Sequence, residues 1–233
     1  ISGSCWGDYL YWDSVNNKWN TGGTQIKLGC DSGKTNQAEN SVAIGVNAGE
    51  INQSEESLAI GYYSGNENQG YAAFSLGTQA GLSNQGDLAV AIGYTSGVFD
   101  QGQSAVSIGY RSGYSQQAQN AIAIGNESAL NYQGTGSIAM GYRAGYTNQG
   151  QNSISIGYES AKNNQLSNAI SIGNLSGHDD QSNYAIAMGT EAGNTNQLEN
   201  AIAIGTNAGK DNQEKYCIAI GLNAGQTTQG SGG

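Results

Sequence analysis

The chain has no proline, one histidine, two phenylalanines and only eight lysines and arginines among its 233 residues. Against 18 acidic residues, these few basic ones leave a net charge of -10, which argues against nucleic acid and anionic membranes as partners. No apolar run approaches the ~20 residues of a membrane span, so we expect no membrane insertion. The absence of proline suits a backbone that hydrogen-bonds along its whole length, because proline lacks an amide hydrogen.

Cysteine is also scarce, and the three present lack the short spacing of a metal site. Cys5 and Cys30 lie on either side of a non-repetitive segment and could be joined by a disulfide. Cys217 falls in a column otherwise filled mainly by alanine and serine, so we expect it to be a small buried residue.

What the sequence does contain is one unit, repeated without insertion. Large apolar residues make up less than a fifth of the chain, a composition typical of disordered proteins. They fall in fixed columns of the repeat, however. In a stack of coils, the large side chains of one coil can therefore pack on those of the next. The pattern predicts an all-β parallel β-solenoid, or β-roll, of thirteen sixteen-residue coils. A glycine marks every unit and a glutamine follows it by eight residues; the glycines are Gly29, Gly45, Gly61, Gly77, Gly93, Gly109, Gly125, Gly141, Gly157, Gly173, Gly189, Gly205 and Gly221.

The four residues before each glycine alternate between small and large side chains, as in residues 41–44 (SVAI). Alternation of period two predicts a strand with Val or Ile on one face and Ala or Ser on the other. Because neither face is charged, we expect both to be covered, with the flat small-residue face available to sister chains. A second glycine four residues later, replaced only by Ala129 and Ala161, indicates a tight turn.

The glutamine column indicates a structural device. A polar residue repeated in every coil lies above its copy, so stacked side-chain amides can donate to and accept from one another along the axis. We expect an inward-facing amide ladder, and ligand binding by an exposed glutamine row is the alternative. The predicted ladder includes Gln53, Gln69, Gln85, Gln117, Gln149 and Gln197.

Residues 1–23 do not fit the repeat and contain all three tryptophans. Two aromatic runs around a polar turn predict a hairpin that caps the open end of the solenoid, and an aromatic ligand-binding cluster is the alternative. We expect a cap or neck over 1–23, the solenoid over 24–229 and a flexible tail over 230–233. Because the sequence starts at Ile1 and ends in GSGG, we expect a processed or excised piece.

The energetics of a single coil favour assembly. Two large aliphatic residues per coil recover little free energy against the entropy of ordering sixteen residues. Burial of one face against sister chains would remedy this, so we predict a homo-oligomer.

The hexad at residues 40–45, NSVAIG, resembles the signature of the head domains of trimeric autotransporter adhesins of the YadA type, and close variants recur at 120–125, 152–157, 168–173 and 200–205. The resemblance covers most of the chain and implies a left-handed β-roll that associates as a homotrimer. The repeat is longer than in those heads and is similar to repeat proteins of large DNA viruses and phage-like tail fibres, as is the opening GDYLYWD. These likenesses imply an extracellular location on a virion or cell surface, with a host-surface glycan or protein as receptor.

The residues give little support for catalysis. The one histidine, His178, lies in a variable turn and is expected to be solvated. Asp100, Asp179 and Asp180 lack the glycine-rich spacing of calcium-binding β-rolls, so we predict no metal site. We expect no enzyme activity, no catalytic residue and no cofactor.

Variable positions just after the glycines offer the best candidate binding surface. Tyrosines recur directly after the glycine and two arginines follow, so stacked coils would form a tyrosine stripe beside two arginines. Ring-on-ring stacking that supports the scaffold is one interpretation, and carbohydrate stacking is the other. The candidate ligand-binding residues are Tyr62, Tyr94, Tyr110, Arg111, Tyr142, Arg143 and Tyr158.

The predicted function is a structural or adhesive fibre segment, a rigid rod of about 60 Å if each coil rises ~4.8 Å. A lectin-like glycan-binding module that uses the tyrosine stripe is the alternative. An ice-binding solenoid ranks last, because no threonine column recurs.

Overall fold

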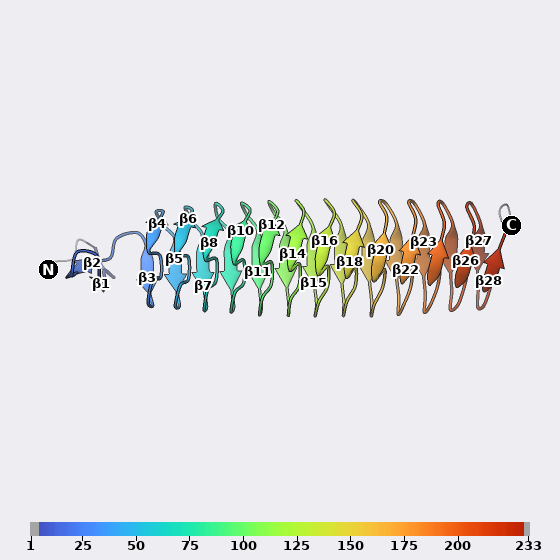
Figure 1. Cartoon of the computed structure of the whole chain (residues 1–233), viewed down its shortest axis with the longest axis horizontal. Helices are drawn as coiled ribbons and strands as arrows, with labels where there is room; N and C mark the ends of the chain where they lie inside the picture. The colour runs from blue at the N-terminus through green and yellow to red at the C-terminus, as the bar shows by residue number, and fades with distance from the viewer. Residues whose placement is uncertain (1–4, 231–233) are drawn as a thin grey trace.

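The computed structural model describes residues 5–230 and contains 28 β-strands and no helix in that range. A small hairpin stands at the N-terminal end, and the remaining strands follow in one elongated stack of coils (Figure 1). The predicted parallel β-solenoid is therefore confirmed. Of the tail expected over 230–233, only Gly230 lies within the described residues.

The hairpin consists of β1 (Leu10–Asp13) and the antiparallel β2 (Lys18–Thr21). Trp12 pairs with Trp19 across the two strands, and their rings meet edge to face with centroids 5.5 Å apart. Trp12 and Trp19 are 48% and 54% exposed, so about half of each residue is covered by other parts of the chain.

A tyrosine joins the base of the hairpin to the first coil. The Tyr9 hydroxyl donates to the backbone oxygen of Gln25 at 2.9 Å and accepts a hydrogen bond from the backbone amide of Lys27 at 2.7 Å. One side chain therefore bonds to two backbone groups at the start of the first strand of the solenoid.

Every coil contributes one strand to each of two 13-stranded parallel sheets. The first, called here the aliphatic sheet, holds the strand just before each constant glycine. Neighbouring strands pair with an offset of sixteen residues, for example Val42 with Leu58. Its strands are β3 (Ile26–Leu28), β5 (Val42–Ile44), β7 (Leu58–Ile60), β9 (Phe74–Leu76), β11 (Val90–Ile92), β13 (Val106–Ile108), β15 (Ile122–Ile124), β17 (Ile138–Met140), β19 (Ile154–Ile156), β21 (Ile170–Ile172), β23 (Ile186–Met188), β25 (Ile202–Ile204) and β27 (Ile218–Ile220).

The second, the amide sheet, holds the strand that ends at each constant glutamine. Its pairs also lie sixteen residues apart, for example Gln53 with Gln69, so each side chain stands over its copy in the next coil. Its strands are β4 (Thr35–Gln37), β6 (Ile51–Gln53), β8 (Glu67–Gln69), β10 (Ser83–Gln85), β12 (Phe99–Gln101), β14 (Ser115–Gln117), β16 (Asn131–Gln133), β18 (Thr147–Gln149), β20 (Asn163–Gln165), β22 (Asp179–Gln181), β24 (Thr195–Gln197), β26 (Asp211–Gln213) and β28 (Thr227–Gln229).

Small side chains and glutamines fill the space between the two sheets. Ala43 and Ala59 have no exposed surface, and the largest fully buried side chains are glutamines. The Gln53 amide reaches across the interior and donates to the backbone oxygen of Val42 at 2.9 Å. The glutamine side chains therefore bridge the two sheets, and the opposing positions hold small residues in every coil except the first, which has Lys27 there.

The large aliphatic residues lie on the outside, which corrects the expected use of the two strand faces. Val42 and Ile44 are half-buried, and Ile204 and Met188 are 37% and 39% exposed. The alternation does distinguish two faces, but the small-residue face is the one turned inward. It is therefore inaccessible to sister chains, and the face available to them carries Val and Ile.

Two backbone conformations explain the glycine columns. Gly173 has a φ of +139°, and a Cβ there would lie 2.5 Å from the carbonyl oxygen of Gly189 in the next coil. Glycines of the second column have φ near +50°, and Ala129 and Ala161 adopt the same left-handed conformation with φ of 45°. The first column thus requires glycine, whereas the second only favours it.

Candidate functional site

The tyrosines of the candidate binding surface lie on the exterior, at the turn after the aliphatic sheet. Tyr94 and Tyr110 are stacked with ring centroids 5.7 Å apart and an interplanar angle of 8°. Tyr142 and Tyr158 are stacked at 5.1 Å and 16°. Each is partly exposed, between 36% and 53%: Tyr62, Tyr94, Tyr110, Tyr142 and Tyr158.

These tyrosines do not form one continuous stripe. Thr78 and Asn126 interrupt the column, and Tyr62 meets Tyr63 of its own coil edge to face instead of a ring in a neighbouring coil. The column therefore consists of two stacked pairs and one separate ring. Much of the flat ring surface that a sugar would need is already in contact with another ring.

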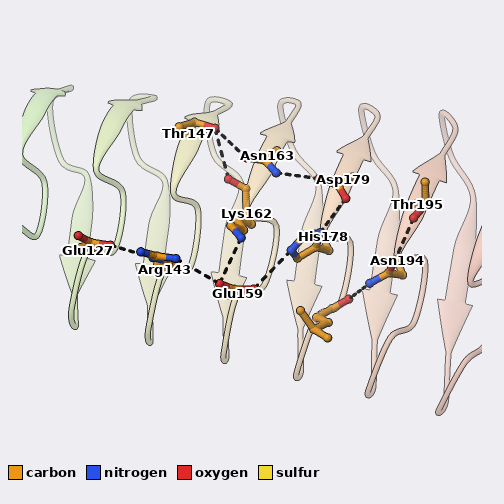
Figure 2. Close-up of polar contacts among 11 residues, drawn as sticks. Glu127, Arg143, Thr147, Glu159, Lys162, Asn163, His178, Asp179, Asn194 and Thr195 are labelled. Carbon is orange, nitrogen blue, oxygen red and sulfur yellow. Dashed lines mark hydrogen bonds and ion pairs between the residues drawn. The ribbon is translucent and has the colours of Figure 1, made fainter.

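The two predicted arginines belong to a row of alternating charges beside the tyrosines. Arg143 Nε lies 2.8 Å from one oxygen of Glu127, and Arg143 Nη1 lies 3.7 Å from Glu159 (Figure 2). Arg111 lies 3.3 Å from the other Glu127 oxygen. The hydrogen bond to Glu127 raises the pKa of the Arg143 guanidinium above its ordinary value. Both arginines are therefore engaged by carboxylates of neighbouring coils.

The arginines also contact aromatic rings. Arg111 lies over the ring of Tyr114 at 5.0 Å, and Arg143 lies over the ring of Tyr142 at 5.1 Å. The structure thus brings the predicted arginines and part of the tyrosine column into one cluster. Its members bind one another, as expected of a scaffold that supports its own surface.

His178 extends this network and is not the solvated turn residue that we expected. Its Nδ1 lies 2.8 Å from Asp179 and its Nε2 lies 3.6 Å from Glu159, which also pairs with Lys162 (Figure 2). The histidine side chain is only 17% exposed. Burial alone would raise the pKa of Asp179, but hydrogen bonds from Asn163 and His178 outweigh that effect and hold the pKa below its ordinary value.

Except at Gln229 in the last coil, the glutamine ladder lies in the interior. Gln69 donates to Gln85 at 3.1 Å, and Gln149 donates to Gln165 at 3.3 Å. A ligand at the surface cannot reach these amides, because each side chain of the predicted set is at most 2% exposed: Gln53, Gln69, Gln85, Gln117, Gln149 and Gln197.

The most extensive surface feature is a pair of apolar columns on the aliphatic sheet, whose outward position was not predicted. Large apolar residues occupy the first and third positions of every strand of the aliphatic sheet, from β3 to β27, and these positions face outward. The two resulting columns, called here the aliphatic face, follow the solenoid along its whole length. The alternation of small and large residues predicted two different strand faces, but it did not identify which face was internal.

We looked for metal and disulfide sites among the described cysteines and acidic residues. Within residues 5–230, no group of three or more His, Cys, Asp or Glu side chains is arranged to hold a metal ion. No disulfide joins Cys5 to Cys30, whereas Cys217 is fully buried, as predicted. The described part of the chain also contains no helix long and apolar enough to cross a membrane.

Comparisons with protein-family models, with curated proteins and with solved structures gave no significant match to this chain. Its surfaces must therefore be interpreted from their own geometry. The aliphatic face is the longest of these surfaces, and the tyrosine and arginine cluster is the most aromatic part of the coils.

Proposed function

We propose that this chain is a segment of a surface fibre in which copies of the solenoid associate side by side, as a homotrimer, through the aliphatic face. The observation that carries this proposal is the continuity of that face over all thirteen strands of the aliphatic sheet. Soluble monomers rarely expose a long contiguous apolar patch. Each Å² of that surface removed from water would contribute ~25 cal/mol to association.

Charge and repeat length both support association along this face. Neither outward column contains a charged residue, so chains with a net charge of -10 can approach there without placing like charges in contact. Because every coil has the same length, parallel copies keep their coils in register from one end to the other. A closed cyclic arrangement then buries the same face on every chain.

We extend the proposal to a structural or adhesive role outside the cell, on a virion or cell surface. It is supported by the resemblance of NSVAIG to adhesin heads and of the longer repeat to viral and phage fibres. A uniform rod with few departures from its repeat suits a spacer or display element. The host-surface receptor, a glycan or a protein, would then contact the variable positions.

The test compares charges placed on opposite sheets. Val90→Lys combined with Ile122→Lys puts two charges on the aliphatic face, two coils apart. Ser83→Lys combined with Ser115→Lys puts the same charges on outward positions of the amide sheet, also two coils apart. In sedimentation velocity, we expect the first pair to dissociate the oligomer and the second to leave it intact. Dissociation by neither pair, or by both equally, would contradict the assigned interface.

A further inference from the structure

A cleft of about 690 Å³ lies between the hairpin and the first coil. In Figure 1 the hairpin is a separate element beyond β3, joined to it by a short connection. The cleft is lined by strand β1, by the hairpin turn, and by the end of β3 with the turn that follows it. Its volume falls within the range usual for sites that bind small molecules.

Two tryptophans supply the aromatic wall of the cleft. Trp12 and Trp19 both line it, and their ring planes are inclined by 70° to each other. About half of each side chain is exposed. Large, partly exposed aromatic surfaces of this kind can cover the apolar C–H face of a sugar ring.

The hairpin turn that carries these rings is held by Asp13. Its carboxylate accepts hydrogen bonds from the backbone amides of Val15 and Asn16, both at 3.0 Å, and from the side chains of Asn16 and Asn20. The bonds from Asn16 lower the pKa of Asp13 below its ordinary value. The aspartate is therefore committed to the turn, and the aromatic wall is preorganised.

Lys27 supplies a charge where every other coil has a small residue. It is the middle residue of β3 and pairs with Ala43, and its column holds only alanine or serine in the other twelve coils. Burial lowers the pKa of the Lys27 ammonium. No carboxylate among residues 5–230 forms an ion pair with it; the charge of Asp13 offsets only part of the effect of burial, and the ring of Tyr11 lies 5.9 Å from the ammonium.

The remaining basic residues of the solenoid differ from Lys27 in this respect. Each forms an ion pair with a glutamate or aspartate: Lys34, Arg111, Arg143, Lys162, Lys210 and Lys215. A partly buried ammonium without an ion-pair partner is costly, and a ligand carboxylate would offset that cost.

We propose that this cleft binds an acidic saccharide, a pyranose that carries a carboxylate. The apolar face of the sugar lies against Trp12 and Trp19, and the carboxylate accepts hydrogen bonds from the Lys27 ammonium. A neutral sugar would leave Lys27 without an ion-pair partner, and a small acid without a ring would leave the aromatic wall uncovered. The two tryptophans and Lys27 together therefore select a ligand that has both a sugar ring and a carboxylate. The inference does not depend on the fibre proposal, since the cleft belongs to a single chain.

The test uses glucuronate and glucose as probes, with binding followed by calorimetry and tryptophan fluorescence. We expect glucuronate to bind at least about tenfold more tightly than glucose, as a charge-assisted hydrogen bond permits. Lys27→Met should remove this preference. Trp19→Ala should weaken the binding of both sugars. Equal affinity for the two sugars, or no binding of either, would overturn the proposal.

Two substitutions outside the cleft serve as matched controls. Lys18→Met removes a lysine from the same hairpin, and Trp6→Ala removes a tryptophan that is 91% exposed; neither residue lines the cleft. Both should leave glucuronate binding unchanged. If Trp19→Ala unfolds the hairpin, Trp19→Phe takes its place in the test, because phenylalanine retains an aromatic ring. Lys27→Met keeps the backbone bond to Tyr9, and an unchanged preference for glucuronate in that variant would contradict the proposal.

Discussion

Gln165 donates its side-chain amide to the side-chain oxygen of Gln181 at 2.9 Å, and neither side chain has any exposed surface. The same amide donates to the backbone oxygen of Ile154 at 3.0 Å. One side chain therefore joins a coil to the next coil and also joins the two sheets. The ladder has one direction, with each Nε2 bonded to the following glutamine from Gln53 onward.

Gln165→Leu tests the contribution of the ladder to stability. The substitution leaves the backbone oxygen of Ile154 and the amide of Gln149 without their bonds to this side chain, and an unsatisfied buried polar group costs ~1–3 kcal/mol. We expect a loss of about 2–4 kcal/mol in the free energy of unfolding, measured with urea. Gln229→Leu, at a half-exposed end of the ladder, should cost much less. Equal effects at the two positions would contradict the account.

Gly173→Ala tests the requirement for glycine in the first turn. The new Cβ would meet the backbone of Gly189, and the φ of +139° is strained for any other residue. We expect a loss of about 3 kcal/mol or more in thermal or urea unfolding. The reciprocal change Ala161→Gly, at a φ of 45°, should be neutral or stabilising by up to about 1 kcal/mol. Tolerance of alanine at position 173 would show that the turn can relax.

The double variant Tyr110→Ser and Tyr142→Ser distinguishes scaffold from lectin. It breaks both stacked pairs, and an aromatic pair contributes ~0.5–1.5 kcal/mol beyond its buried area. We expect lower thermal stability with no change in binding to a glycan array. A variant that stays folded but loses glycan binding would instead favour the tyrosine column as a sugar site.

The lowered pKa of Asp179 predicts that the free energy of unfolding decreases at acidic pH. Because its pKa is lower in the folded chain than the ordinary 3.8, the ionised group stabilises the fold above that pH, and this contribution is lost as the pH falls through the folded-state pKa. Asp179→Asn should therefore reduce the difference in unfolding free energy between pH 7 and pH 3. Asn163→Ala, which removes one of the hydrogen bonds that lower this pKa, should reduce it partly. Unchanged pH profiles in both variants would contradict this assignment.

Much of the coil could be predicted from its columns. The period of sixteen located the strands, and the constant glutamine indicated an internal ladder, because both depend on spacing alone. Left-handed residues such as Asn47 and Asn52 were not predicted, although asparagine is enriched in that conformation and recurs at these positions. The inward face of the strand was assigned wrongly, since its choice depends on the bridge that Gln53 makes between the two sheets.

The surfaces were less predictable than the scaffold. The tyrosines and arginines could be placed beside each other from their columns, but their partners, such as Glu127, required side-chain geometry. The cleft at Lys27 depends on where a non-repetitive hairpin lies against the first coil, which no periodic pattern encodes. The lysine itself was a readable signal, because it breaks a column of alanine and serine.

The molar mass of the chain in solution, measured by light scattering, tests the central claim most directly. In the proposed assembly, a closed cyclic arrangement of three chains would cover the outward aliphatic face on each copy. We predict a mass three times the 24.0 kDa of one chain. A stable monomer at the same concentration would contradict the proposed fibre assembly.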